Sequence, residues 1–343
     1  MELFVEKTVL FFRLSIFDIF FIYYCYNEGG KGVKLNMKIY NSILELTGNT
    51  PLVRLNKIEE KYNINNTLLV KLEMFNPSGS IKIRPAKNMI EKALEKNIIN
   101  KESVVIEATS GNMGIALSLV CSVLGMKFIA VMPSSMSIER QKLIKAYGGE
   151  IVLTKPFLGM EGAKQKALEL KEKLNGFIPS QFENIDNPNS HYLTTAQEIL
   201  NDTNDMVDIV VGGIGTGGTV SGIASRIKKA KDIKVIGVEP SSSPLITKGE
   251  KGSHKIQGIG ANFIPQTLNL KMVDDVIAIT DEEAFFYAKE LALLEGLFVG
   301  ISSGAALAGA LEYIEKNEVK DKTIVIILPD TGERYLSTGI VYE

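Results

Sequence analysis

Short apolar runs alternate with amphipathic stretches of helical period from residue 37 to the end of the chain. Several runs are continuously apolar and rich in β-branched residues, which is typical of strands buried on both faces of a parallel sheet. They predict strands over Leu68–Leu72, Val104–Ala108, Phe128–Met132, Glu150–Leu153, Val207–Val211, Lys234–Val238 and Thr323–Leu328. The amphipathic stretches predict helices over Ile115–Leu124, Ile138–Tyr147, Gly162–Leu174, Tyr192–Asn201 and Glu282–Glu295. Strands that alternate with helices over such a length indicate an α/β protein with mostly parallel sheets.

The length of the chain predicts two domains, since 343 residues is roughly twice the usual domain size of about 150. The stretch Pro179–Ser190 has the weakest pattern and looks like a loop, so we place the boundary near it. We expect an N-terminal α/β domain over residues 37–185, with part of 37–75 packing on the other domain. A C-terminal α/β domain is expected over residues 186–343.

Residues 1–36 differ from the rest of the chain, because they hold nine of the 26 Phe and Tyr residues. Their apolar run, Val9 to Tyr26, contains Arg13 and Asp18. Each central charge costs about 2.5–3.5 kcal/mol on membrane insertion, which argues against a transmembrane helix. A secretory signal would need a small-residue cleavage site, and none follows Tyr26. We interpret residues 1–36 as an extension of unknown role, with Met37 as the expected true start; an interfacial anchor or an added helix is the alternative.

Composition and charge indicate a globular protein and exclude several kinds of ligand. Hydrophobic residues make up 45% and charged residues 23%, which is ordinary for a globular chain. The 38 Lys and Arg residues nearly balance the 40 Asp and Glu residues, so no overall basic field attracts nucleic acid or a membrane surface. Two cysteines and two histidines are too few for a disulfide framework or a zinc site, so we expect no metal. We interpret His191 and His254 as structural.

The strongest candidate for a ligand loop is the glycine cluster Gly212–Thr219, which lies between a predicted strand and a helix. Glycines let the backbone approach a ligand closely, and amides at a helix start bind phosphate oxygens. Three of these glycines match the dinucleotide pattern G-x-G-x-x-G, and Glu239 follows at the expected spacing. Thr216 and Thr219 instead suit a terminal monophosphate. Spacing alone leaves both ligands open, beside a plain glycine turn.

A second turn, Asn76–Pro85, presents Lys82 where a helix opens near Pro85. The positive end of a helix dipole lowers the pKa of a lysine and favours the neutral amine, which a Schiff-base lysine needs. The alternative is an ordinary solvated charge. Two further turns, Thr109–Gly114 and Gly300–Ala305, also precede helices and either cap them or contact a ligand. Four such turns in one α/β chain indicate a site at the carboxyl ends of the strands.

Together these residues resemble the cysteine synthase (O-acetylserine sulfhydrylase) and cystathionine β-synthase family of pyridoxal-phosphate enzymes. The likeness runs from about Ile43 to Thr338. It is carried by Leu46–Val53, Asn76–Ala86, Thr109–Gly114, Gln181–Asn184, Gly215–Thr219, Gly258–Ala261, Ile301–Ala305 and Leu328–Thr338. The resemblance implies fold type II, which is similar to tryptophan synthase β, with two α/β domains. It also favours a monophosphate over a dinucleotide at the glycine cluster.

The resemblance implies a role for each matching residue. Lys82 matches the catalytic lysine that forms a Schiff base with pyridoxal 5′-phosphate and moves the Cα proton. It implies a phosphate cradle of Gly215, Thr216, Gly217, Gly218 and Thr219. Asn112 matches the partner of the cofactor's 3′-oxygen, and Ser302 matches the partner of its ring nitrogen. Substrate binding is implied for Thr109, Ser110, Gly111, Met113, Gln181 and Asn262.

The implied reaction is a β-replacement through an α-aminoacrylate, in which O-acetyl-L-serine and sulfide give L-cysteine and acetate. The sequence departs from the family pattern at Ile83 for aspartate, Met113 for threonine, Ala196-Gln197 for Gly-Pro and Asn262 for glycine. These changes make an L-cysteine-consuming enzyme, releasing hydrogen sulfide and forming lanthionine or serine, the main alternative. An NAD-binding oxidoreductase and a non-catalytic protein with the same fold are two others. The resemblance further implies a cytoplasmic homodimer with a small amino-acid substrate and a serine acetyltransferase as partner.

Overall fold

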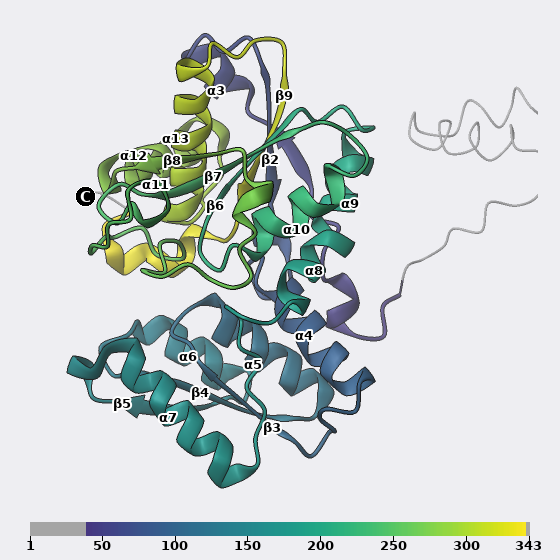
Figure 1. The fold of residues 1–343 in the computed structure, drawn as a ribbon, viewed down its shortest axis with the longest axis vertical. Coiled ribbons are helices and arrows are strands. Elements are labelled where there is room, and N and C mark those ends of the chain that lie inside the picture. Colours follow the sequence, from purple (N-terminus) through teal and green to yellow (C-terminus); the bar gives the residue numbers. More distant parts are fainter. Residues whose placement is uncertain (1–38, 341–343) are drawn as a thin grey trace, which may run out of the picture. The chain divides into compact units, whose positions relative to one another are not determined.

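The computed structural model describes residues 39–340, and Figure 1 shows two sheets with helices packed on them. The larger sheet has the strand order β1-β2-β9-β6-β7-β8. Its strands are β1 (Leu52–Arg54), β2 (Thr67–Leu72), β6 (Ile209–Gly213), β7 (Lys234–Pro240), β8 (Asp275–Ile279) and β9 (Thr323–Leu328). Only the β1–β2 pair is antiparallel. Because β6 and β9 are parallel neighbours, with Val211 opposite Ile326, the residues that follow them emerge at the same edge.

The smaller sheet has the order β3-β4-β5 and is parallel throughout. Its strands are β3 (Val104–Ala108), β4 (Lys127–Pro133) and β5 (Glu150–Thr154). The helices are α3 (Asn56–Lys61), α4 (Ile83–Glu95), α5 (Asn112–Leu124), α6 (Ile138–Ala146), α7 (Gly159–Leu174), α8 (Asp186–Leu193), α9 (Thr195–Asp202), α10 (Gly218–Ile227), α11 (Leu245–Lys248), α12 (Asp281–Glu295) and α13 (Ile301–Lys316). Short 3₁₀ segments are η1 (Ile43–Leu46), η2 (Glu73–Phe75), η3 (Pro156–Leu158), η4 (Leu270–Met272) and η5 (Gly332–Thr338).

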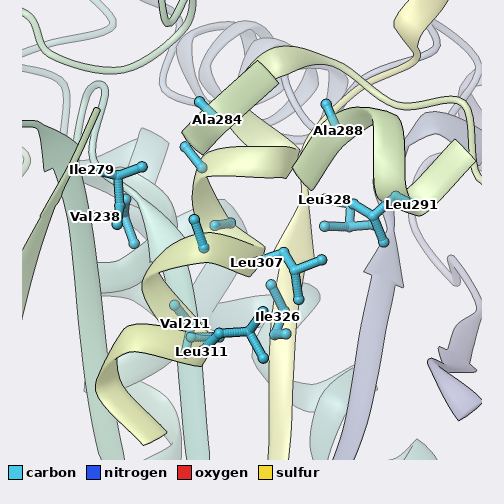
Figure 2. Packing of buried hydrophobic residues seen from close by; sticks show 14 of the residues in the cluster. Val211, Val238, Ile279, Ala284, Ala288, Leu291, Leu307, Leu311, Ile326 and Leu328 are labelled. Carbon is cyan, nitrogen blue, oxygen red and sulfur yellow. The ribbon is translucent and has the colours of Figure 1, made fainter. Parts of the chain in front are cut away.

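Successive residues of the central strand β9 enter two cores, one on each face of the larger sheet. Ile326 and Leu328 belong to the core that includes α12 and α13, which Figure 2 shows with Leu307 and Leu291 beside them. Val325 instead belongs to the core that includes α9 and α10. Both faces of the strand are therefore buried, which explains why its sequence is continuously apolar.

The smaller sheet is covered in the same way. Val105 and Phe128 pack in a core with α4 and α5, whereas the adjacent Ile106 and Ile129 pack with Ala163 and other residues of α7. Helices on both faces of parallel sheets confirm the predicted α/β class.

The seven predicted strands all form, with ends shifted by at most two residues. Two strands were not expected: β1 and β8. The helix predicted over Tyr192–Asn201 is wrong, because the chain breaks at Thr194 into α8 and α9. The stretch Pro179–Ser190 is likewise not a loop throughout, since α8 begins at Asp186.

The division of the chain at residue 185 stays a prediction. β1 and β2 belong to the sheet formed otherwise by β6–β9, and α8 packs against both α4 and α10. The interpretation of residues 1–36 concerns positions outside the described residues. Within residues 39–340, no helix combines the length and the apolar character needed to cross a bilayer.

Candidate active site

A cavity lies at the carboxyl ends of β6 and β9, the edge at which open α/β sheets bind ligands. Seven of the eight residues predicted to bind the cofactor line it: Lys82, Asn112, Gly215, Thr216, Gly217, Thr219 and Ser302. The eighth, Gly218, is the first residue of α10 and follows this lining directly. The fold therefore brings together turns that are far apart in the sequence.

Lys82 is the residue immediately before α4, which begins at Ile83, two residues earlier than Pro85 suggested. Pro85 therefore lies in the first turn of the helix. Backbone N–H groups there have no partner within the helix, so proline loses no hydrogen bond by lacking one. The turn before Lys82 is fixed by Gly79, which has a φ of 66° and whose N–H donates to the Asn76 carbonyl at 2.7 Å. The Ile81 N–H donates to the Pro329 carbonyl at 2.8 Å, which ties the turn to the end of β9.

Burial lowers the pKa of Lys82 to about 8, partly opposed by the negative charge of Asp330. The direction agrees with the sequence prediction, but the first cause is removal of the amine from water rather than the helix dipole. At pH 7 about a tenth of this amine is therefore uncharged, far more than for an ordinary surface lysine.

The glycine cluster connects β6 to α10 by a turn that excludes side chains. A Cβ on Gly215 would overlap the Gly258 carbonyl oxygen, and one on Gly218 would overlap the Asn187 amide. Gly217 has a φ of 75°, a left-handed conformation that favours glycine. No side chain therefore fits at these glycines, and the loop lines the cavity with Gly215, Gly217 and its two threonines.

Both threonines of this loop are held by neighbours. Thr216 Oγ1 accepts the Asn187 Nδ2 group at 3.1 Å and the Gly218 N–H at 3.3 Å, so its own O–H remains a donor. Thr219 Oγ1 lies 3.3 Å from His191 Nε2, whose ring is buried with its pKa well below the usual value, mainly because of that burial. The sequence did not indicate this contact of His191 with the loop.

Glu239 does not serve the glycine cluster. Its carboxylate accepts the N–H groups of Ile246 at 2.8 Å and Thr247 at 2.9 Å, together with the Thr247 hydroxyl at 2.6 Å. These bonds at the start of α11 occupy the carboxylate that a dinucleotide site would use for a ribose hydroxyl. The geometry therefore favours a monophosphate.

The predicted substrate residues lie outside the lining of this cavity. Thr109 is buried at the end of β3, and Ser110 and Gly111 are half-buried in the turn before α5. The Gln181 carbonyl accepts the Asn187 Nδ2 group at 2.7 Å, and this same amide group reaches Thr216. Gln181 is thus connected to the glycine loop through one asparagine.

Two of the departures from the family pattern have structural explanations. Asn262 has a φ of 62°, so asparagine replaces glycine at a left-handed position that it tolerates well. Its side-chain oxygen accepts the Ser243 hydroxyl at 2.6 Å. The Met113 side chain is 2% exposed and packs in the core of α4 and α5. Each replacement therefore has a role in the fold that does not require contact with a substrate.

Sequence reasoning missed two buried carboxylates at the site. Asp330 lines the cavity and follows β9, a position at the carboxyl end of a strand that could have drawn attention to it. Glu107 lies two residues before Thr109, and burial raises its pKa to about 7. Among residues 39–340, no group of His, Cys, Asp or Glu side chains is arranged to hold a metal ion.

Known proteins resemble this chain in both sequence and fold. A family model for pyridoxal-phosphate dependent enzymes matches residues 43–330. The chain is 51% identical over 306 residues to cysteine synthase B of Campylobacter jejuni, covering 89% of this chain and 99% of that protein. It is also similar to the solved structure of a hydrogen sulfide-producing enzyme from Fusobacterium nucleatum, with a TM-score of 0.83 and 46% identity over 87% of this chain and all of that chain. For a cysteine synthase from Entamoeba histolytica the TM-score is 0.86 at 42% identity, covering 90% and 93% of the two chains. These likenesses confirm the resemblance and the fold type predicted from the motifs.

Proposed function

The chain belongs to the family of pyridoxal-phosphate-dependent enzymes, and we propose that it converts O-acetyl-L-serine and sulfide into L-cysteine and acetate. The observation that carries this proposal is its 51% identity to a cysteine synthase over nearly the whole length of that relative. The substrate is a small amino acid whether the enzyme forms L-cysteine or consumes it.

The residues of the cavity fit pyridoxal phosphate. Gly215 and Gly218 stand where no side chain fits, so a phosphate can approach the backbone of the loop closely. The O–H of Thr216 remains free to donate to a phosphate oxygen. Lys82 offers an amine with a pKa of about 8 for the aldehyde carbon. Asn112 and Ser302 line the same cavity and would contact the ring oxygen and the ring nitrogen.

When bound, the cofactor supplies an electron sink that allows a substituent to leave Cβ of the amino acid. Lys82 would hold the cofactor and then use its Nζ atom to take the Cα proton. Thr109, Ser110 and Gln181 would bind the substrate carboxylate, with Gly111, Met113 and Asn262 shaping this region. A serine at the ring nitrogen does not keep that atom protonated as an aspartate would, which favours prompt loss of the Cβ substituent.

A second candidate is an enzyme that consumes L-cysteine, releases hydrogen sulfide and forms lanthionine or serine. The 46% identity to a hydrogen sulfide-producing enzyme favours it. An assay of O-acetylserine plus sulfide against L-cysteine alone separates the two, with cysteine, sulfide, serine, lanthionine and pyruvate measured. Rapid cysteine formation with negligible sulfide release supports the first candidate, and the reverse pattern supports the second.

The variant Lys82→Ala tests the assignment of the lysine. We expect it to lose the absorbance of the lysine-bound cofactor and nearly all turnover. Lys87→Ala is a matched control, since this lysine lies one turn along α4 and its Nζ donates to the Leu44 carbonyl at 3.0 Å. Unchanged absorbance and activity in Lys82→Ala would overturn the assignment of the lysine. Tight NAD binding by a wild-type protein that holds no pyridoxal phosphate would favour the oxidoreductase instead.

The homodimer, the cytoplasmic location and the serine acetyltransferase partner belong to the same proposal. Ile185 and Leu193 support a second copy of the chain, because these large apolar side chains at the two ends of α8 are 71% and 52% exposed. Light scattering of the wild type and of Leu193→Asp tests the dimer, and a wild-type monomer would refute it. Co-purification from cells tests the acetyltransferase.

A further inference from the structure

Asp330 is a carboxylate in the cavity to which the family resemblance assigns no role. It is 1% exposed and lies two residues after the end of β9. Its carbonyl oxygen accepts the Gly300 N–H at 3.1 Å, and it forms a β-bridge with Ser80. The backbone of Asp330 is therefore held between the lysine turn and the turn before α13, which carries Ser302.

One oxygen of this carboxylate is bonded twice and the other is left unpaired. Oδ2 accepts the Asn112 Nδ2 group at 2.6 Å and the Tyr335 hydroxyl at 2.5 Å. Oδ1 is buried and has no hydrogen-bond partner in the described part of the chain. The end of the Asn112 amide that faces Asp330 is therefore its NH₂ group, which donates to Oδ2.

Arg334 holds the other end of the same amide. One of its Nη atoms donates to Asn112 Oδ1, and the other donates to the carbonyl oxygen of Ser78 in the lysine turn. A guanidinium can only donate, so the oxygen of the Asn112 amide must face it. Reversing the amide would set donor against donor at Arg334 and would lose the N–H that Asn112 donates to Asp330.

One hydrogen-bonding group of the Asn112 side chain remains without a partner in this network. A side-chain amide has one oxygen and two N–H groups. Arg334 occupies the oxygen and Asp330 occupies one N–H, which leaves the second N–H without a partner in this network. Asn112 lines the cavity together with Lys82.

We propose that Asp330 is a positioning residue for the cofactor: with Arg334 it holds the Asn112 amide in the one orientation that leaves an N–H for the oxygen of the cofactor ring. This inference rests on the proposed cofactor site. In this role the buried carboxylate orients Asn112 and takes no direct part in the reaction.

The test is a double-mutant cycle on the binding of 4-deoxypyridoxine 5′-phosphate to the apoprotein, measured by calorimetry. This probe keeps the ring oxygen and the phosphate but has no aldehyde, so it forms no bond with Lys82. We expect Asp330→Ala and Asn112→Ala each to weaken binding about tenfold, because each removes one oriented hydrogen bond. In the Asn112→Ala background, adding Asp330→Ala should change the affinity less than twofold.

Asp274→Ala is the matched control. Asp274 is also a bonded aspartate, with Oδ2 2.5 Å from Lys228 Nζ and 2.7 Å from the Val235 N–H, but it lies before β8, at the opposite end of the strands. We expect its removal to leave the affinity for the probe within twofold of the wild type. Should Asp330→Ala fail to fold, Asp330→Asn enters the same cycle. Its neutral amide can face Asn112 with either end, so we expect severalfold weaker binding that again disappears in the Asn112→Ala background.

Two results would overturn the inference while leaving the cofactor site intact: wild-type affinity in Asp330→Ala, or an equal loss with and without Asn112. If the wild-type apoprotein does not bind the probe at all, the proposed cofactor site fails as well. The two failures are therefore distinguishable.

Discussion

The backbone N–H of Gln181 donates to Oε1 of Glu107 at 3.3 Å, and the N–H of the preceding Ser180 donates to Oε2 at 3.1 Å. This carboxylate fastens the end of β3, which leads into Thr109, to the segment that carries Gln181. The two segments proposed to bind the substrate carboxylate are thus held together by one buried side chain that is 4% exposed.

Glu107 should make the stability of the protein depend on pH. Burial raises its pKa to about 7 in the folded state, from an ordinary value of 4.5. The folded state therefore holds this proton more tightly, so stability is highest below about pH 4.5 and is lost as the pH rises through 7. The shift corresponds to roughly 3 kcal/mol. In Glu107→Gln this contribution is absent, and urea unfolding at pH 5 and pH 8 should reveal the difference.

The informative quantity is the difference in unfolding free energy between Glu107→Gln and the wild type, because all other titrating groups cancel. We expect this difference to move in favour of the variant as the pH rises from 5 to 8. Parallel stability curves over that range would contradict the assignment of a raised pKa to Glu107.

Capture of the cofactor by the apoprotein should speed up with rising pH. The neutral amine of Lys82 is the reactive form, and its pKa is lowered to about 8, chiefly by burial. The rate should therefore rise about tenfold from pH 6 to pH 7, pass through half its maximum near pH 8 and level off above pH 9. Stopped-flow absorbance with pyridoxal phosphate measures it. A rate that still climbs tenfold per pH unit above pH 9 would indicate an ordinary, solvated lysine.

The alternation of buried strands and amphipathic helices was enough to predict the fold class, because Val, Ile and Leu fill both faces of strands such as β9. It was not enough for β1, which has three residues and two of them exposed, or for β8, which is only partly buried. The break between α8 and α9 depends on the backbone of Thr194, with a φ of −117° and a ψ of −74°. The spacing of hydrophobic residues along the sequence does not reveal such a break.

The turns that line the cavity could be predicted from the sequence because each has glycine, serine or threonine around it. That their residues bind the cofactor stays a prediction. Glu107 carries no such local sign, and Asp330 was overlooked although it follows a strand and precedes Thr331 and Gly332. The importance of these two carboxylates depends on contacts across the fold, such as the bond between Asn112 and Asp330, which are 218 positions apart. The place of Asn262 in the substrate region stays a prediction, and its departure from glycine is accommodated by a left-handed backbone and a bond to Ser243.

Gly215→Ala should damage the phosphate loop, because the added Cβ would overlap the Gly258 carbonyl oxygen, which cannot move as a side chain could. We expect it to lower the unfolding free energy by about 1–3 kcal/mol and to weaken cofactor binding at least tenfold. Gly111→Ala is the matched control for these two readouts, because a Cβ there meets nothing within 4 Å and the φ of Gly111 is −124°. Equal behaviour of the two variants in calorimetry and cofactor titration would refute the steric argument.

The most costly single substitution should be at Arg84, which lies two residues after Lys82 on α4. Its fully buried guanidinium bonds Glu73 at 2.7 Å and Glu198 at 2.6 Å, so it joins the start of α4 to α9. Arg84→Ala leaves the buried Glu73 without its cation and leaves Glu198 with Lys71 alone, at 2.9 Å. Breaking a buried ion pair in this way typically costs about 3–5 kcal/mol.

Arg54→Ala provides the comparison, since Arg54 also pairs with a glutamate, Glu59, at 2.8 Å but has a side chain 52% exposed. Water screens the exposed arginine of that pair, so its loss should cost much less than the loss of Arg84. Because Arg84 anchors the helix that presents Lys82, its removal should also slow cofactor capture, whereas the Arg54 variant should capture at the wild-type rate. Similar unfolding midpoints in urea for the two variants would show that the buried network does not hold α4 in place.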